Sequence, residues 1–222
     1  MLTAPQTVDF NKSPPKISKA ADFPEAGVLN GLATLPSVPD TILAADSILG
    51  EAWKLNTKTG AYSIAIDVPE MHAPPPPAYH LGINGLRVRD GYLYFTNSGC
   101  ASFLRVPITT AGTVVPGAKV ETLYISSMLL DDFAIAKDGT AYLNTNVGNV
   151  IVAVRQDGKS ATVAGALDQL TIAGGTSAVF GRGKGDCEIL YVATCGGLAA
   201  PINGTVVEPG KVVGIDTKGF RI

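Results

Sequence analysis

Residues 84–107 read NGLRVRDGYLYFTNSGCASFLRVP, and this stretch decides the fold. It starts with a polar residue, continues as a short apolar strand, turns at Asp90-Gly91 and runs through a second strand into a third. The pattern occurs four times, and its polar first residues are 54, 47 and 45 positions apart. Repeats of about 40–50 residues with several strands each are typical of β-propeller blades. We call the four first residues the openers: Asn30, Asn84, Asp131 and Thr176.

These repeats predict an all-β chain, residues 1–222 forming one β-propeller domain of four-stranded antiparallel blades. Residues 1–27, with one strand at residues 7–10, are expected to be the end of a preceding blade. No window shows the 3.6-residue period of a substantial helix. The run Pro74 to Pro77 cannot lie in a central strand, so we expect a stiff polyproline-II loop there. The four blades are predicted at residues 28–68, 84–125, 126–166 and 167–222, with the proline-rich loop at 69–83.

Charge and composition exclude several classes of protein. The 17 basic and 19 acidic residues give a net charge of −2, without the basic stripe that a nucleic-acid partner normally requires. No apolar run approaches the roughly 18 residues of a membrane span. No signal peptide is visible at the N-terminus, and the compartment stays open.

The three cysteines predict neither a disulfide framework nor a zinc site. Cys187 and Cys195 flank one expected strand, which would hold them roughly 26 Å apart, far beyond the reach of a disulfide. We therefore expect Cys100, Cys187 and Cys195 to be buried free thiols. Trp53, in the third strand of the first blade, is expected to pack in the core between blades.

The openers are the main candidates for a functional site. The first strand of a propeller blade lines the central channel, so we expect the openers to converge at one channel mouth. Asn84 precedes Asn97 by 13 residues, as Asp131 precedes Asn144, which supports their equivalence. Their amide and carboxylate oxygens suit a hard cation or a polar ligand. Alternatively, the Asn-Gly and Asp-Asp pairs serve only turn geometry.

A second set of polar residues ends the second strands of the blades. These residues either contact a substrate or satisfy backbone amides of nearby loops. The two histidines flank the proline-rich loop, where one of them could act as an acid or base. No recognisable nucleophile motif accompanies them, and residues 180–187 (FGRGKGDC) lack the spacing of a phosphate-binding loop. The strand-end set is Asp46, Asn97, Asn144 and Thr194, and the histidines are His72 and His80.

Several stretches together carry a resemblance to a known family, among them "GINGLRVRDGYLYFTNS", "DDFAIAKDGTAYLNTN" and "LYVATCGGLAAPINGT". Over nearly its whole length the chain resembles the six-bladed, TolB-like propellers related to the senescence-marker-protein and gluconolactonase family. It is most similar to members from fungal secondary-metabolite pathways, including hetero-Diels–Alderases that join tropolone-type polyketides to terpenes. Six blades need close to 300 residues, so the resemblance implies a partial ring that lacks an N-terminal part. Such a ring leaves two open blade edges, which would have to be covered or paired with a second copy.

The resemblance implies two kinds of chemistry. In a cyclase of the hetero-Diels–Alderase type, needing no cofactor, Asn84, Asp131 and Asn97 would be the catalytic polar groups. Asn30, Asn144, Thr176 and His80 would contact the small-molecule substrate. In a lactone hydrolase, Asn84 and Asp131 would hold a divalent cation, calcium or zinc, together with a Glu that would lie in the missing part. A third possibility is a binding module or degenerate copy without catalysis.

Overall fold

The computed structural model describes residues 5–76 and 80–222 and contains two compact units. Unit 1 comprises the chain up to Gly99 together with Arg105–Glu121, and unit 2 comprises Cys100–Leu104 and Thr122–Ile222. The described residues are almost entirely strands and turns, and their only helical element is the three-residue 3-10 helix η1 (Pro69–Met71). The all-β prediction is therefore confirmed.

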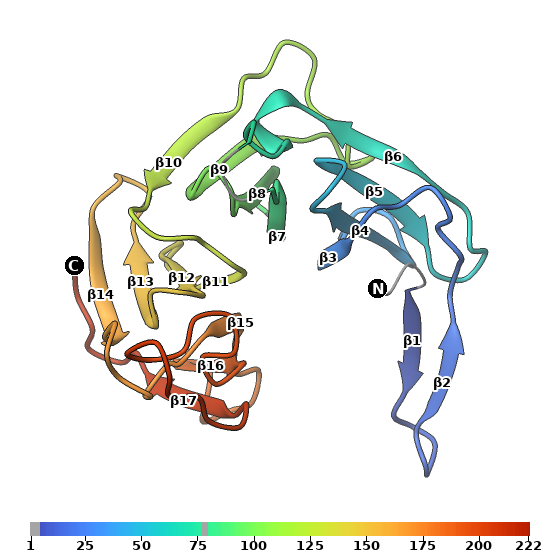
Figure 1. Ribbon diagram of the computed structural model, residues 1–222. Coiled ribbons are helices and arrows are strands. Elements are labelled where there is room, and N and C mark those ends of the chain that lie inside the picture. Colours follow the sequence, from blue (N-terminus) through green and yellow to red (C-terminus); the bar gives the residue numbers. More distant parts are fainter. Residues whose placement is uncertain (1–4, 77–79) are drawn as a thin grey trace. The chain divides into compact units, whose positions relative to one another are not determined.

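The strands form antiparallel meanders in sequence order (Figure 1), as expected for propeller blades. Three blades have four strands, whereas the fourth has three among the described residues. The chain after the last strand continues as a turn closed by the Phe220 amide on the Thr217 carbonyl, rather than as a further strand. The first blade is β3 (Leu29–Thr34), β4 (Thr41–Asp46), β5 (Glu51–Asn56) and β6 (Tyr62–Asp67), and the second is β7 (Ile83–Arg89), β8 (Tyr92–Asn97), β9 (Ser102–Pro107) and β10 (Glu121–Ile125). The third is β11 (Phe133–Ile135), β12 (Ala141–Thr145), β13 (Val150–Val154) and β14 (Ser160–Gly165), and the fourth is β15 (Gly175–Phe180), β16 (Ile189–Thr194) and β17 (Val212–Asp216).

The N-terminal segment differs from its prediction. Instead of one strand, it forms a hairpin of β1 (Gln6–Asp9) and β2 (Lys16–Lys19). All residues of both strands are exposed or half-buried, so β2 lacks the alternation of buried and exposed residues by which a strand is recognised. Of the predicted proline run, Pro74 and Pro75 have no regular structure, Pro76 lies in a turn, and Pro77 lies outside the described residues.

The apolar core of the first blade contains Trp53. Its side chain is buried, and its ring makes edge contacts with Phe23 and Tyr62 at 5.7 and 5.8 Å. Phe23 belongs to the segment between β2 and β3, so this segment covers the blade. The expected burial of Trp53 is confirmed, whereas the rings that it contacts belong to its own blade and to the segment before it.

The cysteines are free thiols, as expected, but the prediction that they are buried is wrong. Cys100 and Cys187 are exposed, and Cys195 is half-buried. Each lies outside the strands, in the β8–β9 turn, in the β15–β16 loop or directly after β16, where turn residues face solvent.

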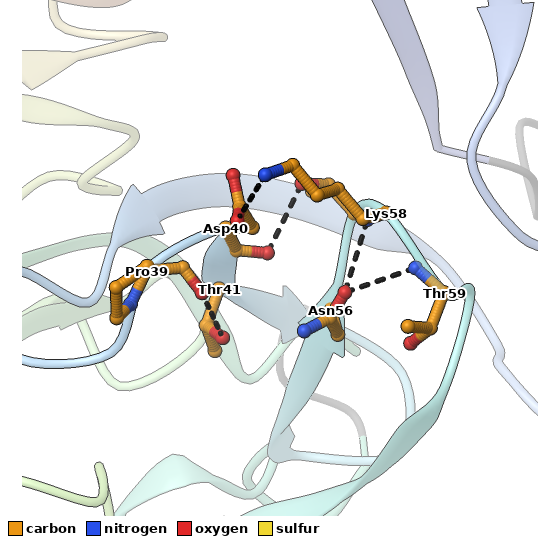
Figure 2. A network of polar contacts seen from close by, with 7 residues as sticks. Pro39, Asp40, Thr41, Asn56, Lys58 and Thr59 are labelled. Carbon is orange, nitrogen blue, oxygen red and sulfur yellow. Dashed lines mark hydrogen bonds and ion pairs between the residues drawn. The ribbon is translucent and has the colours of Figure 1, made fainter.

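A polar network closes the turns at the end of the first blade that lies opposite Asn30 (Figure 2). The Lys58 ammonium forms an ion pair of 2.8 Å with Asp40, and the Thr57 amide donates to the Asp40 carbonyl. The Asn56 Oδ1 accepts hydrogen bonds from the amides of Lys58 and Thr59 at 3.0 and 2.9 Å. The network links the β3–β4 turn to the β5–β6 turn, and the polar residues of these turns therefore have a structural role.

No helix among the described residues is long and apolar enough to cross a membrane.

Candidate functional site

The openers lie where the first strand of each blade departs from regular pairing. The register shifts between Leu29 and Leu32 around Asn30, between Ile83 and Leu86 around Asn84, and between Gly175 and Ser177 around Thr176. Such bulges re-aim side chains and are frequent next to active sites. Asp131 lies two residues before β11, where its amide donates to the Asn144 carbonyl at 2.9 Å.

In three blades the opener side chain bonds a residue just past the second strand. The Asn84 Nδ2 donates to the Ser98 Oγ at 2.9 Å. The Asn30 Nδ2 donates to the Ser47 Oγ at 3.3 Å, and the Asp131 Oδ2 accepts from the Asn146 Nδ2 at 2.9 Å. In the fourth blade, the Thr176 hydroxyl donates instead to the backbone carbonyl of Ala193. The recurring geometry supports the equivalence of Asn30, Asn84 and Asp131.

In unit 1 the openers of the first two blades are neighbours. A Cβ atom added at Gly31 would lie 2.5 Å from the carbonyl oxygen of Asn84, so the two bulges are in close contact. The Ser47 hydroxyl, which accepts from Asn30, donates to the Ile83 carbonyl at 2.7 Å. The structure therefore brings Asn30 and Asn84 together.

Asn84 has an unusual hydrogen-bond state. Its residue is only 3% exposed, yet its Oδ1 atom is buried without a hydrogen-bond partner. A buried acceptor that lacks a partner costs about 1–3 kcal/mol. Functional sites are one place where such a group is retained. Asn84 is therefore the strongest candidate in unit 1.

Unit 2 places the openers of the third and fourth blades close together. The Ser177 hydroxyl, next to Thr176, donates to the Asp132 Oδ2 at 2.8 Å. Asn144 is fully buried, its Nδ2 donates to the Asp132 carbonyl, and its Oδ1 has no partner. A Cβ atom at Gly175 would lie 2.8 Å from this oxygen. Unit 2 thus repeats the buried, unpaired amide oxygen of unit 1.

Sequence reasoning missed several residues of these clusters. The 13-residue spacing favoured Asp131 over Asp132, but it is Asp132 that is buried and bonded to Ser177. Ser47, Ser98 and Asn146 were also missed. Their position directly after the second strand of each blade is the signal that could have found them.

The strand-end residues Asn97, Asp46 and Thr194 are engaged with the backbone. The Asn97 Nδ2 donates to the carbonyls of Glu70 and His72 at 3.0 and 2.8 Å. The Thr194 hydroxyl donates to the Lys211 carbonyl. These bonds favour the structural reading of the set, in which side chains satisfy loop groups.

Asp46 shows how strongly one such residue can be held. Its carboxylate accepts hydrogen bonds from four backbone amides and from the Trp53 Nε1. Burial alone would raise the pKa of Asp46, but the four amide bonds together lower it below its ordinary value. The folded structure therefore favours the charged carboxylate form of Asp46.

The two histidines occupy different settings. His80 is exposed, and the part of the chain that the structure describes shows no hydrogen bond from its side chain. The His72 Nε2 lies 2.8 Å from the Asp67 Oδ1, with both side chains about half exposed. Neither histidine is placed against Asn30 or Asn84 by a hydrogen bond between described residues.

The expected channel mouth would join all four openers. Because Asn84 belongs to unit 1 and Asp131 to unit 2, their convergence stays a prediction. The same holds for the roles predicted for Asn30, Asn97, Asn144, Thr176 and His80.

A divalent cation would need a cluster of hard oxygen donors. The described residues contain no group of three or more His, Cys, Asp or Glu side chains placed to hold a metal ion. The unpaired Oδ1 of Asn84 would suit a cation, but its bonded neighbour in unit 1 is the hydroxyl of Ser98. Neither unit by itself therefore fits a lactonase-type metal centre.

Comparison with known proteins places these observations in context. No protein-family model matches the chain. It is 31% identical to "Putative hetero-Diels-Alderase asR5" of Sarocladium schorii over 96% of this chain and 60% of that protein. It is 30% identical to a "Putative hetero-Diels-Alderase" of a Phoma species over 83% of this chain and 58% of that protein. The chain thus spans about 60% of the length of the curated relatives that it matches.

Solved structures with low sequence identity support the fold. A catalytically inactive virginiamycin B lyase from Staphylococcus aureus, solved with quinupristin, matches 96% of this chain and 63% of its own, with a TM-score of 0.57 and 12% identity. A Bacteroides thetaiotaomicron protein of unknown function matches 90% of this chain and 52% of its own, with a TM-score of 0.60 and 14% identity. At this identity the likeness concerns the β-propeller fold alone.

Proposed function

We propose that the chain belongs to a secondary-metabolite cyclase of the hetero-Diels–Alderase type. Its substrates would be a reactive polyketide-derived oxadiene, such as a quinone methide, and a terpene or other alkene. Similarity to two proteins of that name over 96% and 83% of the chain supports the proposal. The single structural observation that carries it is the buried, unpaired amide oxygen of Asn84.

The reaction requires little from the protein beyond orientation. In a hetero-Diels–Alder reaction one C–C and one C–O bond form together, no group leaves, and no nucleophile or redox partner is needed. Holding diene and alkene in a near-attack arrangement can contribute about 7–11 kcal/mol to lowering the barrier. A hydrogen bond to the oxygen of the oxadiene lowers it further by stabilising the charge that develops there.

Asn84 has the groups for such a role. Its Oδ1 needs a donor, and a substrate hydroxyl would supply one, while its Nδ2 can donate to a carbonyl. Since the Oδ1 is enclosed, the substrate would meet it when the side chain turns out of the β7 bulge. Asn30, the neighbouring opener, and Asp131 with Asn97 would be further polar contacts. Asn144, Thr176 and His80 complete the set proposed to contact substrate.

The test is a cyclisation assay with the purified chain. A quinone-methide precursor and a terpene alkene are mixed with the protein, and rate and stereochemistry are followed by chiral chromatography. We expect faster, stereoselective product formation, and a loss of at least about tenfold in Asn84→Ala, the cost of one transition-state hydrogen bond. Asp131→Asn keeps an acceptor for Asn146 and isolates the effect of the negative charge. Lys58→Ala, in the polar network of Figure 2, is the matched control and should keep full activity.

Two results would speak against a cyclase. Unchanged rate and stereochemistry with the wild-type chain would contradict the cyclase. Hydrolysis of a lactone that depends on added calcium or zinc, and is lost in both Asn84→Ala and Asp131→Asn, would favour the metal-dependent alternative related to gluconolactonases. With neither activity, the chain would be a binding module or a degenerate copy without catalysis.

We also propose that copies of the chain pair through open blade edges. In the described residues β17 pairs only with β16, which leaves one side of its backbone open. Light scattering would report a dimer if copies pair there and a monomer if they do not.

A further inference from the structure

A pocket of about 800 Å³ lies in unit 2, away from the openers. Asp131 precedes β11, whereas the pocket is lined by the turn that follows β11, so it lies at the opposite end of the third blade. The β13–β14 turn, the end of β15, the β15–β16 loop and the segment after β17 complete its walls. Its size falls in the range of about 300–1,000 Å³ that is typical of small-molecule sites.

Three aromatic rings form one wall of the pocket. The Tyr142 ring meets that of Phe180 edge to face at 5.3 Å and that of Phe220 at 6.5 Å. Tyr142 is buried, which fixes the wall in place, while Phe180 and Phe220 are half-buried. A planar ring can pack against such a wall by offset stacking or by edge contacts.

Arg221 supplies a positive charge beside the aromatic wall. Its side chain is exposed and donates to the carbonyl of Phe220 at 2.7 Å, and no carboxylate of the described residues lies within ion-pair distance of it. Arg155, which also lines the pocket, instead lies 3.5 Å from Asp157. A guanidinium with remaining donors in a rigid fork is the preferred partner of a carboxylate.

Three acidic residues line the pocket, and the two that do not pair with Arg155 limit what can bind. Asp138 and Glu188 are both exposed at the pocket. Their carboxylates would repel a second negative charge on a ligand but can accept hydrogen bonds from its hydroxyl groups.

We propose that this pocket is a second ligand site that binds a small planar monocarboxylate, with its ring on Phe180 and Phe220 and its carboxylate on Arg221. The site is separate from the openers and does not depend on the cyclase proposal. It could recognise an aromatic acid with or without hydroxyl groups on the ring.

Binding of 2-naphthoate to the purified chain tests the proposal, followed by ligand fluorescence or calorimetry. We expect saturable binding that weakens at least about tenfold in Arg221→Ala, as for a lost charged hydrogen bond. Arg182→Ala removes an exposed arginine that does not line the pocket and should leave the Kd unchanged. The uncharged 2-naphthamide should bind more weakly than the acid. Equal affinity of wild type and Arg221→Ala, or equal loss in both variants, would overturn the proposal.

Cys187 offers a readout in the wild-type chain that does not depend on any variant. This exposed thiol lines the pocket, whereas the exposed Cys100 does not. Saturating 2-naphthoate should slow alkylation of Cys187 by iodoacetamide severalfold and leave the rate at Cys100 unchanged, as measured by peptide mass spectrometry. Unchanged alkylation of Cys187 at saturation would place the ligand elsewhere and contradict the assignment.

Discussion

The Nδ2 atom of Asn84 lies 2.9 Å from the hydroxyl oxygen of Ser98, while the Oδ1 atom of the same side chain is buried and unpaired. Asn30 with Ser47 and Asp131 with Asn146 repeat the pairing in two other blades. The repeat therefore positions the opener of three blades by the same kind of contact, and at Asn84 one amide oxygen stays enclosed without a partner. A buried acceptor without a partner costs stability rather than adding to it, and for this reason the proposed function is based on Asn84.

Asn84→Ala should separate function from stability. The substitution removes one hydrogen bond but also a buried acceptor without a partner, so the free energy of unfolding should change by less than about 1 kcal/mol. Asn97→Ala, the comparison, should cost about 2 kcal/mol, because the carbonyls of Glu70 and His72 lose their donor. Urea denaturation measures both. A larger loss for Asn84→Ala than for Asn97→Ala would show that Asn84 is mainly structural.

Glu51→Gln should stabilise the protein at neutral pH. Glu51 lies directly opposite Asp46 on one side and Asp67 on the other. Burial and these two carboxylates raise the pKa of Glu51, and His72 partly offsets them. Like charges in opposed positions cost about 0.5–1 kcal/mol, which Gln removes.

The pH dependence of this gain follows from the sign of the shift. Because the folded-state pKa is raised, the wild-type protein recovers stability as the pH falls through that pKa. The advantage of Glu51→Gln should therefore disappear below pH about 4, where the carboxyl group is protonated in both states. Thermal melts from pH 3 to 8 measure the difference, and a gain that stays constant over that range would contradict this account.

Asp46→Asn should destabilise the protein by about 2 kcal/mol at neutral pH, because bonds from amides to a charged acceptor are among the stronger ones. The pKa of Asp46 is lowered in the folded state. Its contribution is thus complete above the unfolded value of about 3.9 and is lost as the pH falls through the folded value. The gap between wild type and variant should be flat from pH 5 to 8 and close below pH 4. A gap that widens on acidification would contradict the prediction.

Gly31→Ala should disturb the contact between the bulges of Asn30 and Asn84. The added Cβ would lie 2.5 Å from the Asn84 carbonyl oxygen and 2.9 Å from the Cα of Gly85, and backbone atoms cannot easily move away. We expect a loss of about 2 kcal/mol, typical of overpacking. Gly185→Ala is the matched control, since its Cβ would meet nothing within 4 Å, and it should be neutral within about 0.5 kcal/mol. Equal melting temperatures of the two variants would refute the close contact.

Most strands could be predicted because their signals are local. The turns at Asp90-Gly91, Asp138-Gly139 and Asp157-Gly158 separate β7 from β8, β11 from β12 and β13 from β14, as the alternation predicted. β2 was not predicted, because a strand in an exposed hairpin needs no apolar face. The burial of the cysteines was predicted wrongly from residue type alone, and their place in turns overrides it.

The candidate site, too, could be predicted from the sequence only in part. By itself the sequence determined the all-β class and the order of the blades, and it predicted the equivalence of Asn84 with Asp131, because these depend on spacing and alternation along the chain. Only the tertiary structure decided that Asn84 keeps an unpaired oxygen, that Asp132 bonds Ser177 from 45 residues away and that Arg221 stands beside Tyr142. Whether a polar atom finds a partner depends on which segments pack against it. Those contacts are set by long-range pairing of strands, which no local pattern contains.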